Sequence, residues 1–195
     1  LSMPQPDFVE VEAETYWSAF KDSLMKVLSE SKVNVRDILG IAVSSQGESF
    51  IPLGRDGKPL RRAIVWLDNR SREEAQLIKD EFGVDRVYSV TGQNDVIPTW
   101  TATKILWLKR NEPTVFEKTY KYLLLEDYMI YRLTGEFATE YSVVCSSLLF
   151  DITRRKWWSD ILDFIGITED QLPELKPSGV FVGNITSEVA EETGL

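Results

Sequence analysis

The stretch Ala63–Ser71 places the strongest constraint on what this chain can fold into. It reads Ala63-Ile64-Val65-Trp66-Leu67-Asp68-Asn69-Arg70-Ser71. The apolar, partly β-branched start predicts a buried strand, which runs directly into charged residues. Ser71, with Glu74 three positions on, predicts a capping box that starts a helix. Because open α/β sheets place ligands at the carboxyl ends of their strands, Trp66 becomes the first candidate binding residue.

A second apolar stretch ends in the same way. Leu39–Ser44 predicts a strand, and the small and polar residues Ser45-Gln46-Gly47-Glu48-Ser49 follow it. Two such strand ends predict a polar pocket with an aromatic wall. Between them, Phe50–Leu53 and Ile64–Leu67 predict strands that the Asp56-Gly57 turn joins as a hairpin.

Elsewhere the pattern alternates helices and strands. Helices are expected over about 12–31, 71–82, 84–90, 99–110, 127–133, 157–165 and 186–193, and strands over Tyr122–Leu125 and Val180–Val182. Trp17, Phe20 and Leu24 illustrate the helical spacing of apolar residues in the first helix. Mixed hairpin and crossover connections favour an α/β fold with a mixed sheet and flanking helices.

Composition excludes several classes of function. The net charge of -9 argues against nucleic acid as a main partner. No apolar run approaches the roughly 20 residues that a membrane span needs. The chain has no histidine and one cysteine, Cys145, so it cannot hold a Ser-His-Asp triad, a His-liganded metal or an internal disulfide. Acid–base chemistry here would fall to Asp, Glu, Lys or Tyr. The absence of Met at position 1 and the ending in Gly194-Leu195 suggest part of a longer protein.

An ordered set of motifs resembles the FGGY family of carbohydrate kinases, which includes glycerol, xylulose, ribulose and gluconate kinases. The matching pieces are Gly40–Ser49, Gly57–Leu60, Ala63–Arg70, Thr91-Gly92, Thr103–Trp107, Glu126–Tyr128, Arg132–Glu136, Ser146–Ile152, Trp158, Leu172-Pro173, Gly183 and Ala190–Leu195. The resemblance implies a ribonuclease-H-like fold of the actin-like ATPase superfamily. It also implies that residues 1–195 are most of the N-terminal, substrate-side domain, without its first strands and its C-terminal end, and without the second domain.

The resemblance also implies a set of substrate-binding residues. Glu48 matches a carboxylate that binds substrate hydroxyls, and Gly47 stands where glycerol kinases carry an Arg. Trp66 matches the tryptophan that forms a wall of the substrate site.

Three further residues complete this set. Thr99 replaces a substrate-contacting tyrosine, Trp100 beside it can take over that wall, and Gln46 either reaches the pocket or holds the turn.

Other conspicuous residues are read as structural. Asp68 and Arg70 are expected to form an ion pair that fixes the turn after Trp66. Asp127 is expected to cap a helix, and Cys145 to be a small packed side chain.

The resulting hypothesis is a fragment of an ATP-dependent kinase that phosphorylates a small sugar or polyol in the cytoplasm. ATP and Mg²⁺ would serve the full-length enzyme, with a catalytic base beyond Leu195, so no catalytic residue or metal ligand is assigned here and the isolated chain is expected to be inactive. No nucleic acid or membrane partner is expected, and a homodimer is allowed. One alternative is a non-catalytic sugar-binding or assembly module; another is an actin-like ATPase that binds no sugar.

Overall fold

A computed structural model describes all 195 residues, and its centre is a four-stranded sheet. The strands are β1 (Glu10–Val11), β2 (Phe50–Leu53), β3 (Ala63–Ile64) and β4 (Lys121–Leu124). Their order is β1-β3-β2-β4, and every neighbouring pair is antiparallel. The predicted hairpin between β2 and β3 is confirmed: Gly57 has φ 73°, the left-handed backbone that this turn requires.

The sheet is covered on both faces, because successive side chains of a strand point to opposite sides. Phe50, Ile64 and Leu124 enter one core cluster, which also holds residues of α2, α4 and α8. Ile51 and Leu123 enter a second cluster, with residues of α1, α6 and α9. Burial on both faces explains why these strands read as continuous apolar runs rather than alternating ones.

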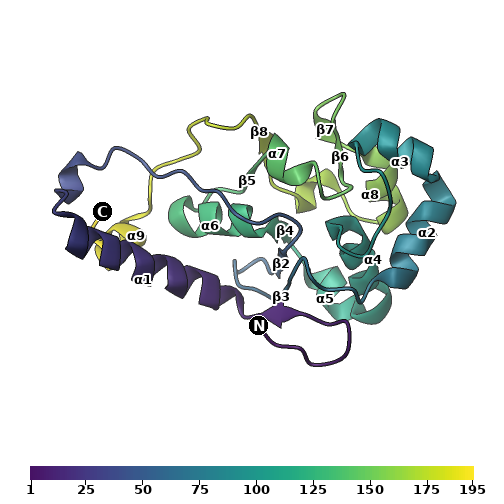
Figure 1. Cartoon of the computed structure of the whole chain (residues 1–195), viewed down its shortest axis with the longest axis horizontal. Coiled ribbons are helices and arrows are strands. Elements are labelled where there is room, and N and C mark those ends of the chain that lie inside the picture. The colour runs from purple at the N-terminus through teal and green to yellow at the C-terminus, as the bar shows by residue number, and fades with distance from the viewer.

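Helices lie on either side of the short strands (Figure 1). Their bounds are α1 (Ala13–Ser31), α2 (Arg72–Phe82), α3 (Val84–Thr91), α4 (Thr101–Asn111), α5 (Pro113–Lys118), α6 (Leu125–Thr134), α7 (Tyr141–Val144), α8 (Ser159–Ile165) and α9 (Ser187–Thr193). Figure 1 places α1, α6 and α9 towards one end of the molecule and α2, α3 and α8 towards the other. No helix has the length and hydropathy to cross a bilayer.

Two small sheets complete the fold. β5 (Ala138–Glu140) pairs in parallel with β8 (Glu174–Lys176), and β6 (Phe150–Asp151) pairs antiparallel with β7 (Lys156–Trp157). Two 3-10 turns, η1 (Val35–Asp37) and η2 (Glu169–Gln171), lie in the connections. The predicted mixed α/β class is therefore confirmed.

The strand predicted at Leu39–Ser44 is absent. No backbone group of residues 39–45 takes part in a backbone–backbone hydrogen bond, and Leu39 is 98% exposed. The segment lines two hollows, of about 600 and 460 Å³. Val180–Val182, the other strand that fails to form, lines the larger hollow. An apolar run becomes a strand only where a neighbouring strand takes up its backbone hydrogen bonds.

Two helix starts also differ from prediction. Ser71 makes no capping bond, because its hydroxyl lies 2.8 Å from Thr103 Oγ1 and donates to Pro98 O at 3.1 Å. Asp127 is not the N-cap of α6: it lies in the first turn, and its carboxylate accepts a hydrogen bond from the Leu124 N–H at 2.8 Å. The local sequence assigns the Ser71 hydroxyl to the helix cap, but tertiary hydrogen bonds occupy it instead.

Candidate functional site

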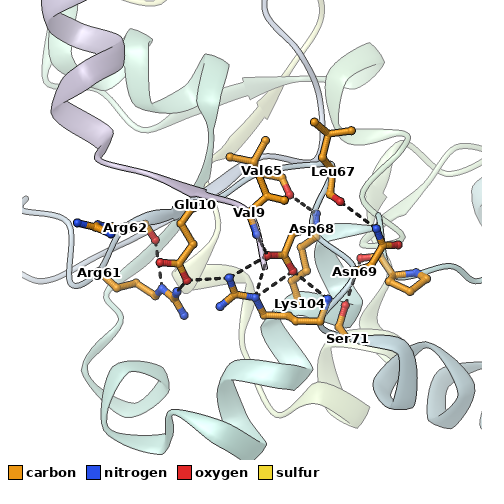
Figure 2. A network of polar contacts seen from close by, with 12 residues as sticks. Val9, Glu10, Arg61, Arg62, Val65, Leu67, Asp68, Asn69, Ser71 and Lys104 are labelled. Atoms are coloured by element: carbon orange, nitrogen blue, oxygen red, sulfur yellow. Dashed lines mark hydrogen bonds and ion pairs between the residues drawn. The ribbon is translucent and has the colours of Figure 1, made fainter. Parts of the chain in front are cut away.

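A buried ionic network fixes the turn that follows Trp66 (Figure 2). Arg70 Nη2 lies 2.8 Å from Asp68 Oδ2 and 2.7 Å from Glu10 Oε1, and the Arg70 and Asp68 side chains are fully buried. The guanidinium stacks on the rings of Phe8 and Trp107, 3.9 and 4.8 Å from their centroids. The predicted scaffold role of Asp68 and Arg70 is confirmed.

The same carboxylate joins this turn to the start of the chain. Asp68 Oδ2 accepts a hydrogen bond from the backbone N–H of Val9 at 2.5 Å, and Figure 2 shows Val9 next to Asp68. Val9 immediately precedes β1, so the edge strand and the turn after Trp66 are held as one unit.

Trp66 lies just beyond β3 with 40% of its surface exposed. Its backbone N–H donates to Ser49 Oγ at 3.0 Å, and the carbonyl of Val65 accepts from Lys104 Nζ at 3.1 Å. The strand predicted over Ile64–Leu67 ends earlier than expected, because β3 stops at Ile64 and Trp66 belongs to the turn. The indole is therefore presented to solvent from a backbone held firmly on both sides.

Glu48 reaches the same place from the segment before β2. Its φ is 59°, in the left-handed region that residues other than glycine rarely adopt. Its carbonyl oxygen lies 3.5 Å from Lys104 Nζ. The next residue, Ser49, is buried and carries the hydroxyl that binds the Trp66 backbone. The structure thus brings Glu48 and Trp66, which are distant in sequence, to adjoining positions.

Gln46 and Gly47 flank this pair. Gln46 Nε2 donates to Ser49 Oγ at 2.9 Å and to Tyr16 OH at 3.2 Å, so in this structure its amide supports the turn. A Cβ placed on Gly47 would meet Ser146 Oγ at 3.1 Å. A side chain at position 47 would therefore point at Ser146.

Thr99 and Trp100 lie immediately before α4, with Trp100 as its N-cap, and both are half-buried. The indole N–H of Trp100 donates to Asp95 O at 2.9 Å, so this polar group is already occupied and the ring packs against the larger core cluster. Trp100 is one helical turn before Lys104, which connects α4 to the Glu48 and Trp66 loops.

Lys104, Ser49 and Ser146 were missed as site residues by sequence reasoning. The sequence does contain one sign of Lys104, which is a charged residue within the helix predicted over 99–110. In the structure all of Thr101–Leu108 is buried. Ser49 and Ser146 carry no comparable signal, because their importance depends on which residues lie across from them.

The cysteine and the possible metal ligands contribute little to the site. Burial raises the pKa of the Cys145 thiol, and Glu140 and Glu48 raise it further, so the thiol is protonated near neutrality. No three His, Cys, Asp or Glu side chains gather into a group that could hold a metal ion.

Solved structures place the fold among carbohydrate kinases. The xylulose kinase of Rhodospirillum rubrum superposes with a TM-score of 0.93 at 25% identity, covering 100% of this chain and 40% of that one. Curated relatives include a xylulose kinase of Bacillus subtilis, 39% identical over 174 residues, 89% of this chain and 34% of the relative. A glycerol kinase of Thermococcus gammatolerans is 37% identical over 192 residues, 95% of this chain and 38% of the relative.

The sequence profile of the family described as "FGGY family of carbohydrate kinases, N-terminal domain" matches residues 1–195. The chain belongs to this family. It spans 34% to 40% of the length of the three proteins just described. The resemblance inferred from the motifs is confirmed, as is the actin-like ATPase fold that it implies.

Proposed function

We propose that this chain is the carbohydrate-recognition part of an ATP-dependent kinase that phosphorylates a hydroxyl of a small sugar or polyol. Family membership supports this function, as do relatives named as xylulose and glycerol kinases. The observation that carries it is the joint fixation of Glu48 and Trp66 through Ser49 and Lys104.

The two side chains have complementary chemistry for such a substrate. The Glu48 carboxylate can accept hydrogen bonds from two hydroxyls, and charged acceptors bind more strongly than neutral ones. The Trp66 ring can pack on the C–H face of a sugar, with its N–H free to donate. We include Gln46, Thr99 and Trp100 as residues that flank the substrate, and Gln46 would act by supporting the turn. Because Gly47 replaces the Arg of glycerol kinases, we expect a ketose to be preferred to glycerol.

In the full-length enzyme these residues would bind and orient the acceptor hydroxyl, which is the main requirement for phosphoryl transfer. We place the catalytic base and the residues that hold ATP and Mg²⁺ outside residues 1–195. ATP supplies the phosphoryl group when bound. Closure of the second domain over the site would exclude water.

We further propose that the domain is completed by strands outside this chain. Residues 39–45 make no backbone–backbone hydrogen bond, and hollows of about 600 and 460 Å³ lie beside them; both observations support this. A strand added there would take up the free backbone groups and cover Leu39. Hydrogen exchange should show residues 39–45 protected in the full-length protein and unprotected in residues 1–195 alone. Equal exchange in the two would contradict the domain proposal.

A cytoplasmic location and a homodimer belong to the same proposal. The unpaired Cys145 is consistent with a reducing compartment. Sedimentation of the purified full-length protein tests the dimer, and fractionation tests the location.

The function is tested by measuring ADP release from the full-length protein with a ketopentose, glycerol and gluconate. We expect turnover with at least one of them, a large loss of kcat/KM in Trp66→Ala, and no turnover by residues 1–195 alone. Binding of a carbohydrate without turnover would instead indicate the non-catalytic module. ATP hydrolysis without any carbohydrate binding would indicate an actin-like ATPase of another kind.

A further inference from the structure

Lys104 is a buried amine with no carboxylate bound to it. It lies within α4 with 0% exposure, and its Nζ lies 3.1 Å from Val65 O and 3.5 Å from Glu48 O. Burying a lysine is costly unless its donors are used, and here backbone carbonyls of two separate loops use them. Figure 2 shows Lys104 beside the Val65–Asp68 turn.

Both carbonyls belong to peptide units that set the proposed binding residues. The Val65 carbonyl and the Trp66 N–H are two ends of one peptide group, which Lys104 holds at one end and Ser49 Oγ at the other. The Glu48 carbonyl belongs to the peptide that joins Glu48 to Ser49. Contact with Lys104 therefore helps to hold Glu48 in its left-handed backbone conformation.

The charge on this amine is sensitive to its surroundings. Burial lowers the pKa of Lys104 to about 7, while Asp68 and Glu48 act in the opposite direction and Arg70 adds to the lowering. On the neighbouring helix α2, the buried Glu74 pairs with Arg110 through Oε1, and its Oε2 has no hydrogen-bond partner. Hydrogen bonds from a charged donor are stronger than those from a neutral one. The hydrogen bonds from Lys104 to the two carbonyls should therefore weaken as the amine loses its proton.

We propose that Lys104 is a positioning residue that sets Glu48 and Trp66 for carbohydrate binding. It acts through the backbone of their two loops rather than by touching the substrate. The inference rests on the proposed function. It states that the buried lysine fixes the position of the Glu48 carboxylate relative to the Trp66 indole.

The test compares Lys104→Met with the parent in the full-length enzyme. Met keeps the length and apolar stem of the side chain but donates no hydrogen bond. Because both binding residues would shift, we expect the KM for the carbohydrate to rise about tenfold or more, with the KM for ATP within about twofold of the parent value. Equal effects on both KM values would overturn the inference and leave Lys104 a merely stabilising residue.

Lys109→Met is the matched control. Lys109 is on the same helix and also donates to a carbonyl, Ile165 O at 2.6 Å, but at the end of α8. Its loss should lower thermal stability without changing the KM for the carbohydrate. A rise in that KM as large as that of Lys104→Met would contradict the positioning role.

A second measurement needs no variant and remains decisive if Lys104→Met does not fold. In the parent enzyme the KM for the carbohydrate should rise severalfold between about pH 6 and pH 8, as Lys104 titrates near 7. The KM for ATP should stay flat over this range. A flat carbohydrate KM would overturn the inference, whereas absence of any carbohydrate turnover by the parent would overturn the proposed function itself.

Discussion

Arg70 and Asp68 form an ion pair in which neither side chain has any exposed surface, with Nη2 2.8 Å from Oδ2. The pair satisfies more than itself. Asp68 also binds the Val9 N–H, and Arg70 also binds Glu10 and stacks on Phe8. The turn that presents Trp66 is thereby locked to the edge strand of the sheet.

Asp68→Asn should strongly destabilise the protein, because it leaves the buried Arg70 guanidinium with Glu10 as its main counter-charge. Breaking a buried pair from one side typically costs about 3–5 kcal/mol. Urea denaturation measures the free energy of unfolding. Arg72→Ala is the control: it removes an exposed pair with Asp7 at 3.1 Å and should cost about 1 kcal/mol or less. Similar losses in the two variants would contradict the buried role of Asp68.

Glu48→Gln should weaken carbohydrate binding selectively. The amide keeps the size of the side chain and one acceptor oxygen but loses the charge that strengthens its hydrogen bonds. We expect the KM for the carbohydrate in the full-length enzyme to rise about tenfold, equivalent to about 1.4 kcal/mol. Glu73→Gln, at a carboxylate 83% exposed, is the control and should leave the KM for the carbohydrate unchanged. An unchanged carbohydrate KM in Glu48→Gln would remove Glu48 from the site.

Gly47→Ala should be felt at Ser146, because the new Cβ would lie 3.1 Å from Ser146 Oγ. Gly47 has a backbone that an alanine can adopt, since its φ is not positive. The single variant should lose about 1 kcal/mol of stability by crowding. Adding Ser146→Ala should restore most of it, which a double-mutant cycle of urea denaturation measures. Purely additive effects would show that the two residues do not meet.

Asp127→Asn should change how stability depends on pH. Burial raises the pKa of Asp127 to about 8. The folded protein therefore keeps a proton that the unfolded chain releases near pH 4, so this group lowers stability as pH rises from about 4 to 8.

Asn does not titrate in this window, and it can still accept the Leu124 N–H. The unfolding free energy of the variant relative to the parent should rise by up to about 1.4 kcal/mol per pH unit between pH 4 and 8. Asp22→Asn, at an exposed position, is the control, and its unfolding free energy should vary with pH in parallel with that of the parent. A parallel curve for Asp127→Asn would contradict the raised pKa.

Local patterns predicted the central elements well. β2 has the predicted bounds Phe50–Leu53, and the helix expected over 12–31 is found at Ala13–Ser31. Gly57 and the glycines after α3 and α6 lie where the backbone turns left-handed. Apolar periodicity and turn residues are properties of neighbouring positions, so they can be read without knowing the tertiary structure.

Prediction failed where an element depends on a distant partner. Leu39–Ser44 has the composition of a strand but no neighbour to pair with. Ser71 and Glu74 have capping-box spacing, yet Ser71 binds Thr103 and Glu74 binds Arg110. For Ser71 and Glu74, the local preference for a capping box is worth less than the tertiary contacts that replace it.

Ordered motifs and residue chemistry were enough to predict the class of fold, the family and the candidates Glu48 and Trp66. The folded chain was needed to see that Ser49 and Lys104 hold the two together, and that Gly47 faces Ser146. Hydrogen bonds and close contacts between loops depend on distances in space, which a sequence does not give. Those distances exist only once the sheet has brought the ends of its strands side by side.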